Sequence, residues 1–237
     1  MFALGTIVNT AAIILGGFLG LLFGGLLQQR HQDSLCKTCG VCTLFIGISG
    51  ALEGMLRVEN GAIVSSGSML IVISLAIGAV IGEAMKIEDA FENFGEWLKR
   101  KTGNSGDAKF VDAFVTASLT VCIGAMAIVG SIQDGIRGDY SILATKAVLD
   151  LIIIMVMTCS MGRGCVFSAI PVAILQGSIT ALAGLLRPLM TAAALNNLSL
   201  VGNVLIFCVG VNLVWGKKVK VANLLPAVVI AVIWAFF

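Results

Sequence analysis

Charged residues are scarce in this chain of 237 residues: Asp, Glu, Lys and Arg together make up 12% of it, and it contains a single histidine. Soluble globular domains carry about twice that share of charge. Hydrophobic residues account for 58% of the chain, and the mean hydropathy is +1.04. The formal net charge of +2 is too small to indicate nucleic acid as a partner. The composition therefore predicts an integral membrane protein surrounded by the lipid bilayer.

Catalytic motifs are also absent. The chain contains no H-E-x-x-H, no G-x-S-x-G and no P-loop, so zinc proteolysis, a nucleophile elbow and the direct use of ATP lack support. The stretches CKTCGVC and MVMTCSMGRGC could hold a thiophilic metal such as Cu(I). Cys and Met are, however, ordinary apolar residues of membrane helices. We favour this second interpretation and expect no enzymatic activity, no metal and no cofactor.

What the chain has instead is a series of long apolar segments. A helix that crosses about 30 Å of hydrocarbon needs roughly 20 apolar residues. Short polar breaks separate about eight such segments, so we predict an all-α, polytopic transmembrane helix bundle. The fifth and sixth segments are separated only by MGRG, so they are either a tight hairpin of spans or one span followed by a broken or re-entrant segment. The segments are 3–27, 38–56, 67–85, 110–133, 141–159, 165–187, 198–215 and 221–237.

The first segment lacks the basic leading region of a signal peptide, so we expect it to remain in the mature protein. Basic residues then fix the orientation, because they are retained in cytoplasmic loops. With both termini outside, the outer loops hold only Arg57, Arg137 and Arg187. The inner loops hold Arg30, Lys37, Lys86, Lys99, Arg100, Lys101, Lys109, Arg163, Lys217, Lys218 and Lys220.

The longest break between segments, KIEDAFENFGEWLKRKTG, has apolar residues at helical spacing, acidic residues early and basic residues late. This pattern predicts an amphipathic helix near 87–101 that lies on the cytoplasmic face of the membrane. The helix is either a connector that anchors the third and fourth segments or a regulatory surface.

Glycines recur every fourth residue at Gly16, Gly20 and Gly24, and again at Gly78 and Gly82. Such spacing lets membrane helices approach closely. The contacts are either within the chain or form a homo-oligomer interface. Short similar stretches also suggest internal repeats, which many transporters contain.

Two charges lie inside the fifth apolar segment. Lys146 and Asp150 are four residues apart, hence on one face of a helix, and each costs roughly 2.5–3.5 kcal/mol to insert alone. They form either a self-compensating packing pair or part of a polar pathway. The topology brings Glu53, Gln133 and Asp134 to the same outer half of the membrane, although Glu53 and Asp134 could be solvated at the rim. We favour the pathway.

A second polar group surrounds Pro171, which cannot donate a backbone hydrogen bond and leaves the carbonyl of Phe167 free. Ser168 and Gln176 lie on either side of this expected helix break. Broken membrane helices supply ligands to ions and substrates, but they also occur as plain kinks. Asn9 is a weaker polar candidate in the first segment. We expect Asp139 to cap the fifth helix.

The chain resembles a bacterial inner-membrane family of unknown function that includes YqgA and YdfK. The resemblance rests on GTIVNTAAIILGG, IGAVIGE, ASLTVCIGAMAIVGSIQDGIRGD, KAVLD, FSAIPVAILQGSIT and NLLPA, and it spans nearly the whole chain. Val121 and Leu151 depart from the pattern. The resemblance implies the bacterial cytoplasmic membrane but no activity. The residues on the family's motifs are Gln133, Asp134, Gly135, Gly138, Asp139, Lys146, Asp150, Ser168 and Gln176.

The sequence thus predicts a single integral membrane domain over 1–237 that transports or conducts an ion or small polar solute. The route would run from Glu53, Asp134, Lys146 and Asp150 past Pro171 to Gln176. The alternative is a sensor or assembly protein that acts through the helix near 87–101.

Overall fold

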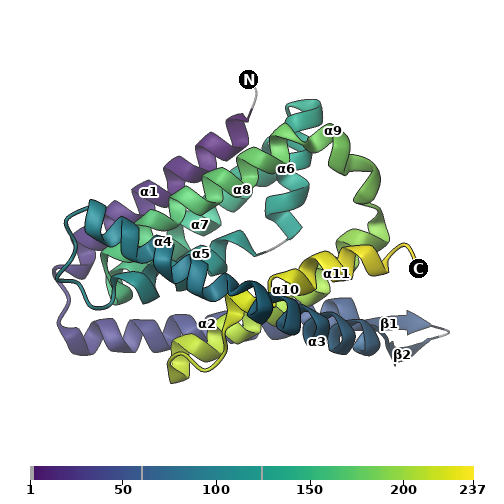
Figure 1. Cartoon of the computed structure of the whole chain (residues 1–237), viewed down its shortest axis with the longest axis horizontal. Coiled ribbons are helices and arrows are strands. Elements are labelled where there is room, and N and C mark those ends of the chain that lie inside the picture. Colours follow the sequence, from purple (N-terminus) through teal and green to yellow (C-terminus); the bar gives the residue numbers. More distant parts are fainter. Residues whose placement is uncertain (1–2, 60, 124) are drawn as a thin grey trace. The chain divides into compact units, whose positions relative to one another are not determined.

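The computed structural model describes residues 3–59, 61–123 and 125–237 of the chain (Figure 1). Helices account for nearly all of the regular structure, so the predicted all-α polytopic fold is confirmed. The elements are α1 (Leu4–Gly24), α2 (Gln29–Met55), β1 (Leu56–Glu59), β2 (Ala62–Ser65), α3 (Ser68–Met85), α4 (Ile87–Lys101), α5 (Phe110–Cys122), α6 (Ala125–Arg137), α7 (Ser141–Met161), η1 (Arg163–Ser168), α8 (Ala169–Ala181), α9 (Ala183–Leu186), η2 (Arg187–Leu189), α10 (Ala192–Trp215), η3 (Val221–Leu224) and α11 (Pro226–Trp234).

Six helical segments of the described residues are long and apolar enough to cross a membrane. They are α1, α2, α3, α7, α10 and the segment Arg163–Ala181, which joins η1 to α8. The eighth expected segment contains a shorter apolar helix over Val221–Trp234. The fourth expected segment is not one straight helix, because α5 and α6 are bent by 61° relative to each other.

The fifth and sixth expected segments are α7 and Arg163–Ala181, and each is long enough to span on its own. The chain turns between them at Gly162, whose φ of 95° is a conformation that side chains other than glycine rarely adopt. This geometry favours the tight hairpin over a re-entrant segment. The broken pair lies one segment earlier, at the end of α5.

By its contacts the chain divides into two compact units. Unit 1 comprises Met1–Cys39, Ala90–Cys122 and Met126–Leu186, and unit 2 comprises the remaining residues. The single domain expected over 1–237 stays a prediction.

Within unit 1, α1 packs lengthwise and parallel against α7 (Figure 1). Gly16 lies against the carbonyl of Leu151, and Gly20 lies against that of Met155. A side chain at either glycine would collide with backbone, so the close approach requires glycine. The glycine repeat of α1 is therefore occupied within the chain.

Helix α8 runs antiparallel to α1 in the same unit. Thr6 contacts Thr180 near one end, and Gly17 contacts Val166 near the other. Helices α1 and α7 thus run one way through unit 1 and α8 runs the other way. This is the alternation of direction that successive membrane spans require.

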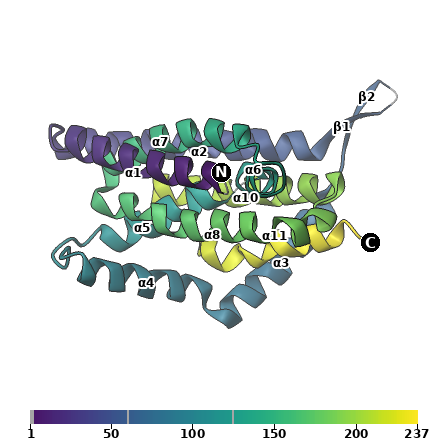
Figure 2. The ribbon, with the colours of Figure 1, turned by 90° about the horizontal axis from the view of Figure 1, so that it is seen from above.

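Within unit 2, the helices that pack against each other are antiparallel. Gly78 lies against Ala227 and Gly82 against Asn223, which sets α3 beside α11 (Figure 2). Gly47 of α2 lies against Phe207 of α10. The strands β1 and β2 form an antiparallel hairpin, with Leu56 paired to Ser65.

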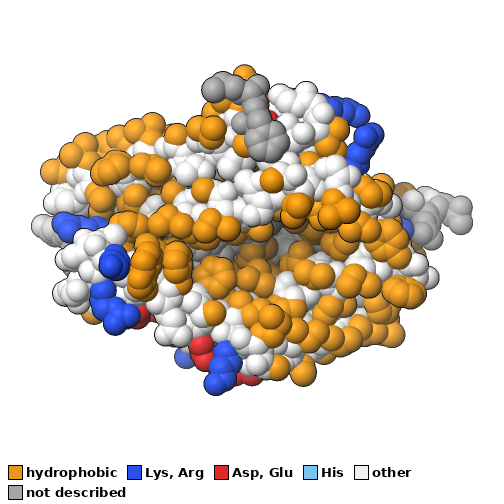
Figure 3. All heavy atoms as spheres, turned by 45° about the horizontal axis from the view of Figure 1, so that its top comes forward, with side chains coloured by type: hydrophobic (Ala, Val, Ile, Leu, Met, Phe, Trp, Pro, Cys, Tyr) orange, Lys and Arg blue, Asp and Glu red, His pale blue; other side chains and the backbone are white. Residues whose placement is uncertain are grey.

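Large apolar side chains face outward from the long helices. Phe18 of α1, Phe45 of α2 and Val80 of α3 are all more than 60% exposed. On the face shown in Figure 3, hydrophobic side chains predominate and Lys and Arg gather at the margin. In a membrane protein such a surface contacts lipid tails.

Helix α4 occupies the position of the expected amphipathic helix. Its residues in unit 1 pack on α5, because Phe94 contacts Phe114 with ring centroids 5.8 Å apart and Leu98 is buried. Trp97 stacks on Phe94 and remains half exposed. The location of α4 at the cytoplasmic face stays a prediction.

Candidate functional site

The two charges inside α7 form a buried ion pair. The Lys146 ammonium lies 2.7 Å from Oδ1 and 2.6 Å from Oδ2 of Asp150. Lys146 is only 7% exposed and Asp150 only 3%, so neither charge is solvated from outside. The pairing expected from their spacing is present. In a low-dielectric interior, removal of either charge would leave the other uncompensated and destabilise the protein.

Lys146 has a third acceptor on another helix. Its ammonium donates to the backbone carbonyl of Val121 at 2.9 Å, in the last turn of α5. The last carbonyls of a helix have no partner within the helix, and they carry the negative end of its dipole. The end of α5 therefore lies at the buried charge pair. This is the feature of the site that the sequence did not reveal.

Asn9 of α1 completes the surroundings of Asp150. Its Nδ2 donates to Oδ2 of Asp150 at 3.0 Å. The side chain is fully buried, and its Oδ1 has no protein partner. Asn9 thus contributes one satisfied donor and one free oxygen beside the ion pair.

Asp134 of α6 caps the beginning of α1. Its Oδ2 accepts a hydrogen bond of 3.0 Å from the backbone N–H of Gly5, one of the unpaired donors in the first turn of α1. A carboxylate is favoured there by the helix dipole. Asp134 is 2% exposed, and its Oδ1 has no protein partner. The structure thus places Asp134 in the interior and not at a solvated rim.

Gln176 lies on the buried face of α8, one turn before Thr180. Because Thr180 contacts Thr6 and the two helices are antiparallel, Gln176 lies at about the level of Asn9. It is 1% exposed, and neither its amide nitrogen nor its amide oxygen has a protein partner. Buried amides without partners are rare and costly, which points to a ligand or water at this level.

The remaining residues predicted for the site are Gln133, Ser168, Pro171 and Glu53. Gln133 is half-buried, and the Ser168 hydroxyl donates to the carbonyl of Cys165 at 2.7 Å. Pro171 lies in the first turn of α8, three residues after the helix changes from 3-10 to α form. A missing N–H costs little in a first turn. Glu53 belongs to unit 2, and its side chain is exposed.

A second polar cluster, in unit 2, joins the α3–α4 junction to the loop before α11. The Glu88 carboxylate is buried and accepts from the backbone N–H of Ala222 at 2.9 Å, while the N–H of Glu88 donates to Asn223 at 2.7 Å. Glu83 accepts from Lys220 at 2.9 Å, and this partner raises the pKa of Lys220 above its ordinary value. The sequence suggested only an acidic first turn for α4. The cluster fixes the beginning of that helix.

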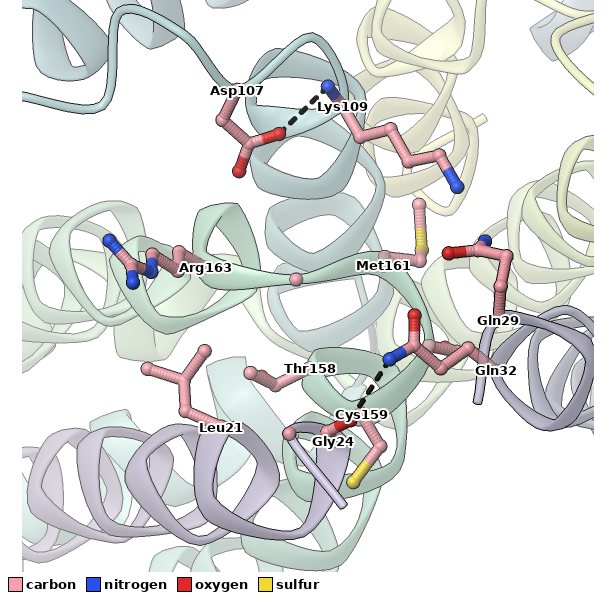
Figure 4. A pocket seen from close by; sticks show the side chains of 13 residues that line it. Leu21, Gly24, Gln29, Gln32, Asp107, Lys109, Thr158, Cys159, Met161 and Arg163 are labelled. Atoms are coloured by element: carbon pink, nitrogen blue, oxygen red, sulfur yellow. Dashed lines mark hydrogen bonds between the residues drawn. The ribbon is translucent and has the colours of Figure 1, made fainter. Parts of the chain in front are cut away.

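A cavity of 520 Å³ lies in unit 1 where α1 and α7 end (Figure 4). Gln32 reaches across its margin to donate to the carbonyl of Gly24 at 2.9 Å. Thr158 lies on α7 two turns beyond Asp150 and is only 2% exposed. The cavity is lined by Leu21, Gly24, Gly25, Gln29, Gln32, Asp107, Lys109, Thr158, Cys159, Ser160, Met161, Gly162 and Arg163.

Among the residues that the structure describes, no three His, Cys, Asp or Glu side chains are placed to hold a metal ion together. No disulfide joins the cysteines found there. The contacts of the buried site offer oxygen and amide groups to a ligand.

The fold and this site define a polytopic α-helical membrane protein whose interior holds an ion pair and several polar atoms without a protein partner. The chain belongs to the family described as protein of unknown function (DUF554), whose model matches residues 4–236. It is 32% identical to the uncharacterized membrane protein YdfK of Bacillus subtilis (strain 168), over 98% of this chain and 97% of that protein. It is 28% identical to the uncharacterized protein YqgA of Escherichia coli (strain K12), over 96% and 94% of the two chains. No solved structure matches the chain.

Proposed function

We propose that the protein is a transporter or channel for an ion or small polar solute in the bacterial cytoplasmic membrane. It has no enzymatic activity, and both termini lie outside. The observation that carries this proposal is the end of α5, whose Val121 carbonyl meets the Lys146–Asp150 pair inside an apolar helix bundle. Membrane proteins tolerate a helix end at such depth where it lines a polar cavity or binds a ligand.

Unpaired polar atoms support a pathway over a packing pair. A pair that only fixed helix packing would need no further polar groups, because Lys146 and Asp150 already neutralise each other. Gln176, Asn9 and Asp134 nevertheless each keep a buried atom without a protein partner. Polar groups of this kind are expensive in the membrane unless a solute or water uses them.

The route follows the polar face of α1. It begins at Asp134 and Gly5, continues past Asn9 and the ion pair, and reaches Thr158 and the cavity at the other end of α7. With both termini outside, the first end is external and the cavity is cytoplasmic. The solute's own gradient or an ion gradient would drive movement, because the chain has no ATP-binding motif.

The alternative, a sensor or assembly protein that acts through α4, has less support. The apolar residues Phe94 and Leu98 face α5 and are used within unit 1. What α4 leaves exposed is Trp97, part of Phe94 and its basic end, which suit an anchor at a lipid surface.

Accessibility to water tests the pathway. In a cysteine-free background, Gln176→Cys should react with a membrane-impermeant thiol reagent, whereas Ile174→Cys should not. Ile174 is the matched control because it lies two residues away on α8, is 61% exposed and faces lipid. Equal protection of both cysteines from the reagent would contradict the pathway.

A further inference from the structure

The oxygen atoms around the Lys146 ammonium have the composition of a cation site. Three of them, the two Asp150 carboxylate oxygens and the Val121 carbonyl, lie 2.6–2.9 Å from Nζ. An ammonium has three hydrogens to donate, so its donors are fully used. The free Oδ1 of Asn9 belongs to the amide that already contacts Asp150. Carbonyl ends of broken helices together with carboxylates hold monovalent cations in transporters.

We propose that this cage is a monovalent-cation site that the chain fills with its own lysine. Lys146 is thus a tethered cation, and the proposed transport requires no sodium or potassium ion at this position. The proposal deepens the function proposed above by naming what occupies the end of α5. The geometry of the cage does not itself depend on that function.

The charges around the cage support a positive occupant. Helices α1 and α8 carry no charged residue. Helix α6 adds buried Asp134, with Arg137 at its exposed end, and α5 adds Asp112 in its first turn, far from Val121 along the helix. The segment η1 contributes the exposed Arg163. Without Lys146, the buried surroundings of Asp150 would therefore be negative, and a cation would be attracted to them.

Two substitutions separate the charge of Lys146 from its volume. Lys146→Ala removes the ammonium and leaves space beside Asp150 and Val121, whereas Lys146→Met removes the charge and fills the space. A small cation can therefore enter the first variant and not the second. Methylammonium is the sharpest probe, because it restores the lost carbon–ammonium end of the lysine.

Thermal unfolding in detergent is measured in choline chloride, which is replaced at constant ionic strength by methylammonium, ammonium, potassium or sodium chloride. We expect the Tm of Lys146→Ala to rise with the concentration of at least methylammonium or ammonium, by roughly 5 °C at a hundredfold excess over Kd. The Tm of wild type, Lys146→Met and Lys146→Ala with Asp150→Asn should not respond to these ions.

If Lys146→Ala is too unstable to purify in choline chloride, folded protein should still be recovered when ammonium or methylammonium is present throughout. Equal recovery or equal Tm in every salt would overturn the tethered cation, as would the same response in Lys146→Met. This result is independent of transport. A cation response without solute flux in the wild type would retain the site and reject the proposed function, and flux without a cation response would do the opposite.

Discussion

The substitution Lys146→Met leaves Asp150 as a buried carboxylate without its counter-charge. In the wild type both carboxylate oxygens lie within 2.7 Å of the ammonium, and Asp150 is 3% exposed. Only the amide of Asn9 would continue to donate to it. Removal of one partner of a buried ion pair typically destabilises a protein by about 3–5 kcal/mol.

Protonation sets an upper limit to this loss. The variant can take up a proton and hold Asp150 as a neutral acid. Aspartate ordinarily titrates near pH 3.9, so at pH 7 this proton costs about 4 kcal/mol, at about 1.4 kcal/mol per pH unit. Because the folded variant then binds one more proton than the unfolded chain, its stability rises as pH falls. We therefore expect the destabilisation to shrink by about 1.4 kcal/mol per unit between pH 7 and about pH 4.

The assay is unfolding in mixed micelles of detergent and dodecyl sulfate at several pH values. The double variant Lys146→Met with Asp150→Asn is the control. It removes both charges, keeps an acceptor for Asn9, and should recover most of the lost stability with no dependence on pH in this range. The reasoning is refuted if Lys146→Met is as stable as the wild type at pH 7, or if the double variant is no more stable than the single one.

Three further outcomes follow from the contacts. Gly16→Ala should destabilise the protein by about 1–3 kcal/mol because a methyl group would meet the backbone of Leu151. Gly177→Ala should be neutral or stabilising, because a methyl group there would meet no atom within 4 Å beyond the backbone of its own helix and its two neighbours in the chain. Unfolding in micelles measures both, and equal effects would contradict the packing. Gln176→Leu should leave stability unchanged or higher but abolish flux, because its amide has no protein partner; a loss of stability would show a structural role. The N–H of Ser141 lowers the pKa of Asp139, so Asp139→Ala should lower the Tm at neutral pH. The difference in Tm from the wild type should vanish as pH falls through that lowered pKa. A difference that persists in acid would exclude a stabilising role for the Asp139 carboxylate at this helix end.

Hydrophobic length alone was enough to locate most of the helices, because the bilayer fixes how many apolar residues a span needs. Likewise, the spacing of Lys146 and Asp150 determined their pairing, since residues four apart on a helix are neighbours whatever surrounds them. Asp139, expected to cap α7, lies one residue before the N-cap Tyr140, and its Oδ1 accepts from the first backbone N–H of the helix at Ser141.

Contacts between segments distant in sequence could not be predicted in this way. The cap of α1 by Asp134 joins residues 129 apart, and nothing in either helix indicates the other. Asn9 had only a weak claim because its importance comes from Asp150 on α7. Glu53 belongs to unit 2 and the pair to unit 1, so its place on the pathway stays a prediction.

The helix break shows a different limit. Pro171 was the obvious candidate, but proline in a first turn leaves the helix intact. Helix α5 ends at Cys122, in a stretch without proline, and the Val121 carbonyl freed there accepts a hydrogen bond from a lysine 25 residues later. Tertiary contacts of that kind decide where a membrane helix ends, and they leave no local signal.

Solute movement across reconstituted membranes tests the central claim most directly. Tracer uptake and current are measured in proteoliposomes under imposed gradients of protons, sodium, potassium, chloride and small organic ions. Wild type is compared with the folded double variant Lys146→Met with Asp150→Asn. We expect gradient-dependent flux in the wild type, and none in the double variant although it inserts and is stable. Equal flux in the two proteins would show that Lys146 and Asp150 serve only to pack the helices. No flux of any solute in the wild type would contradict transport.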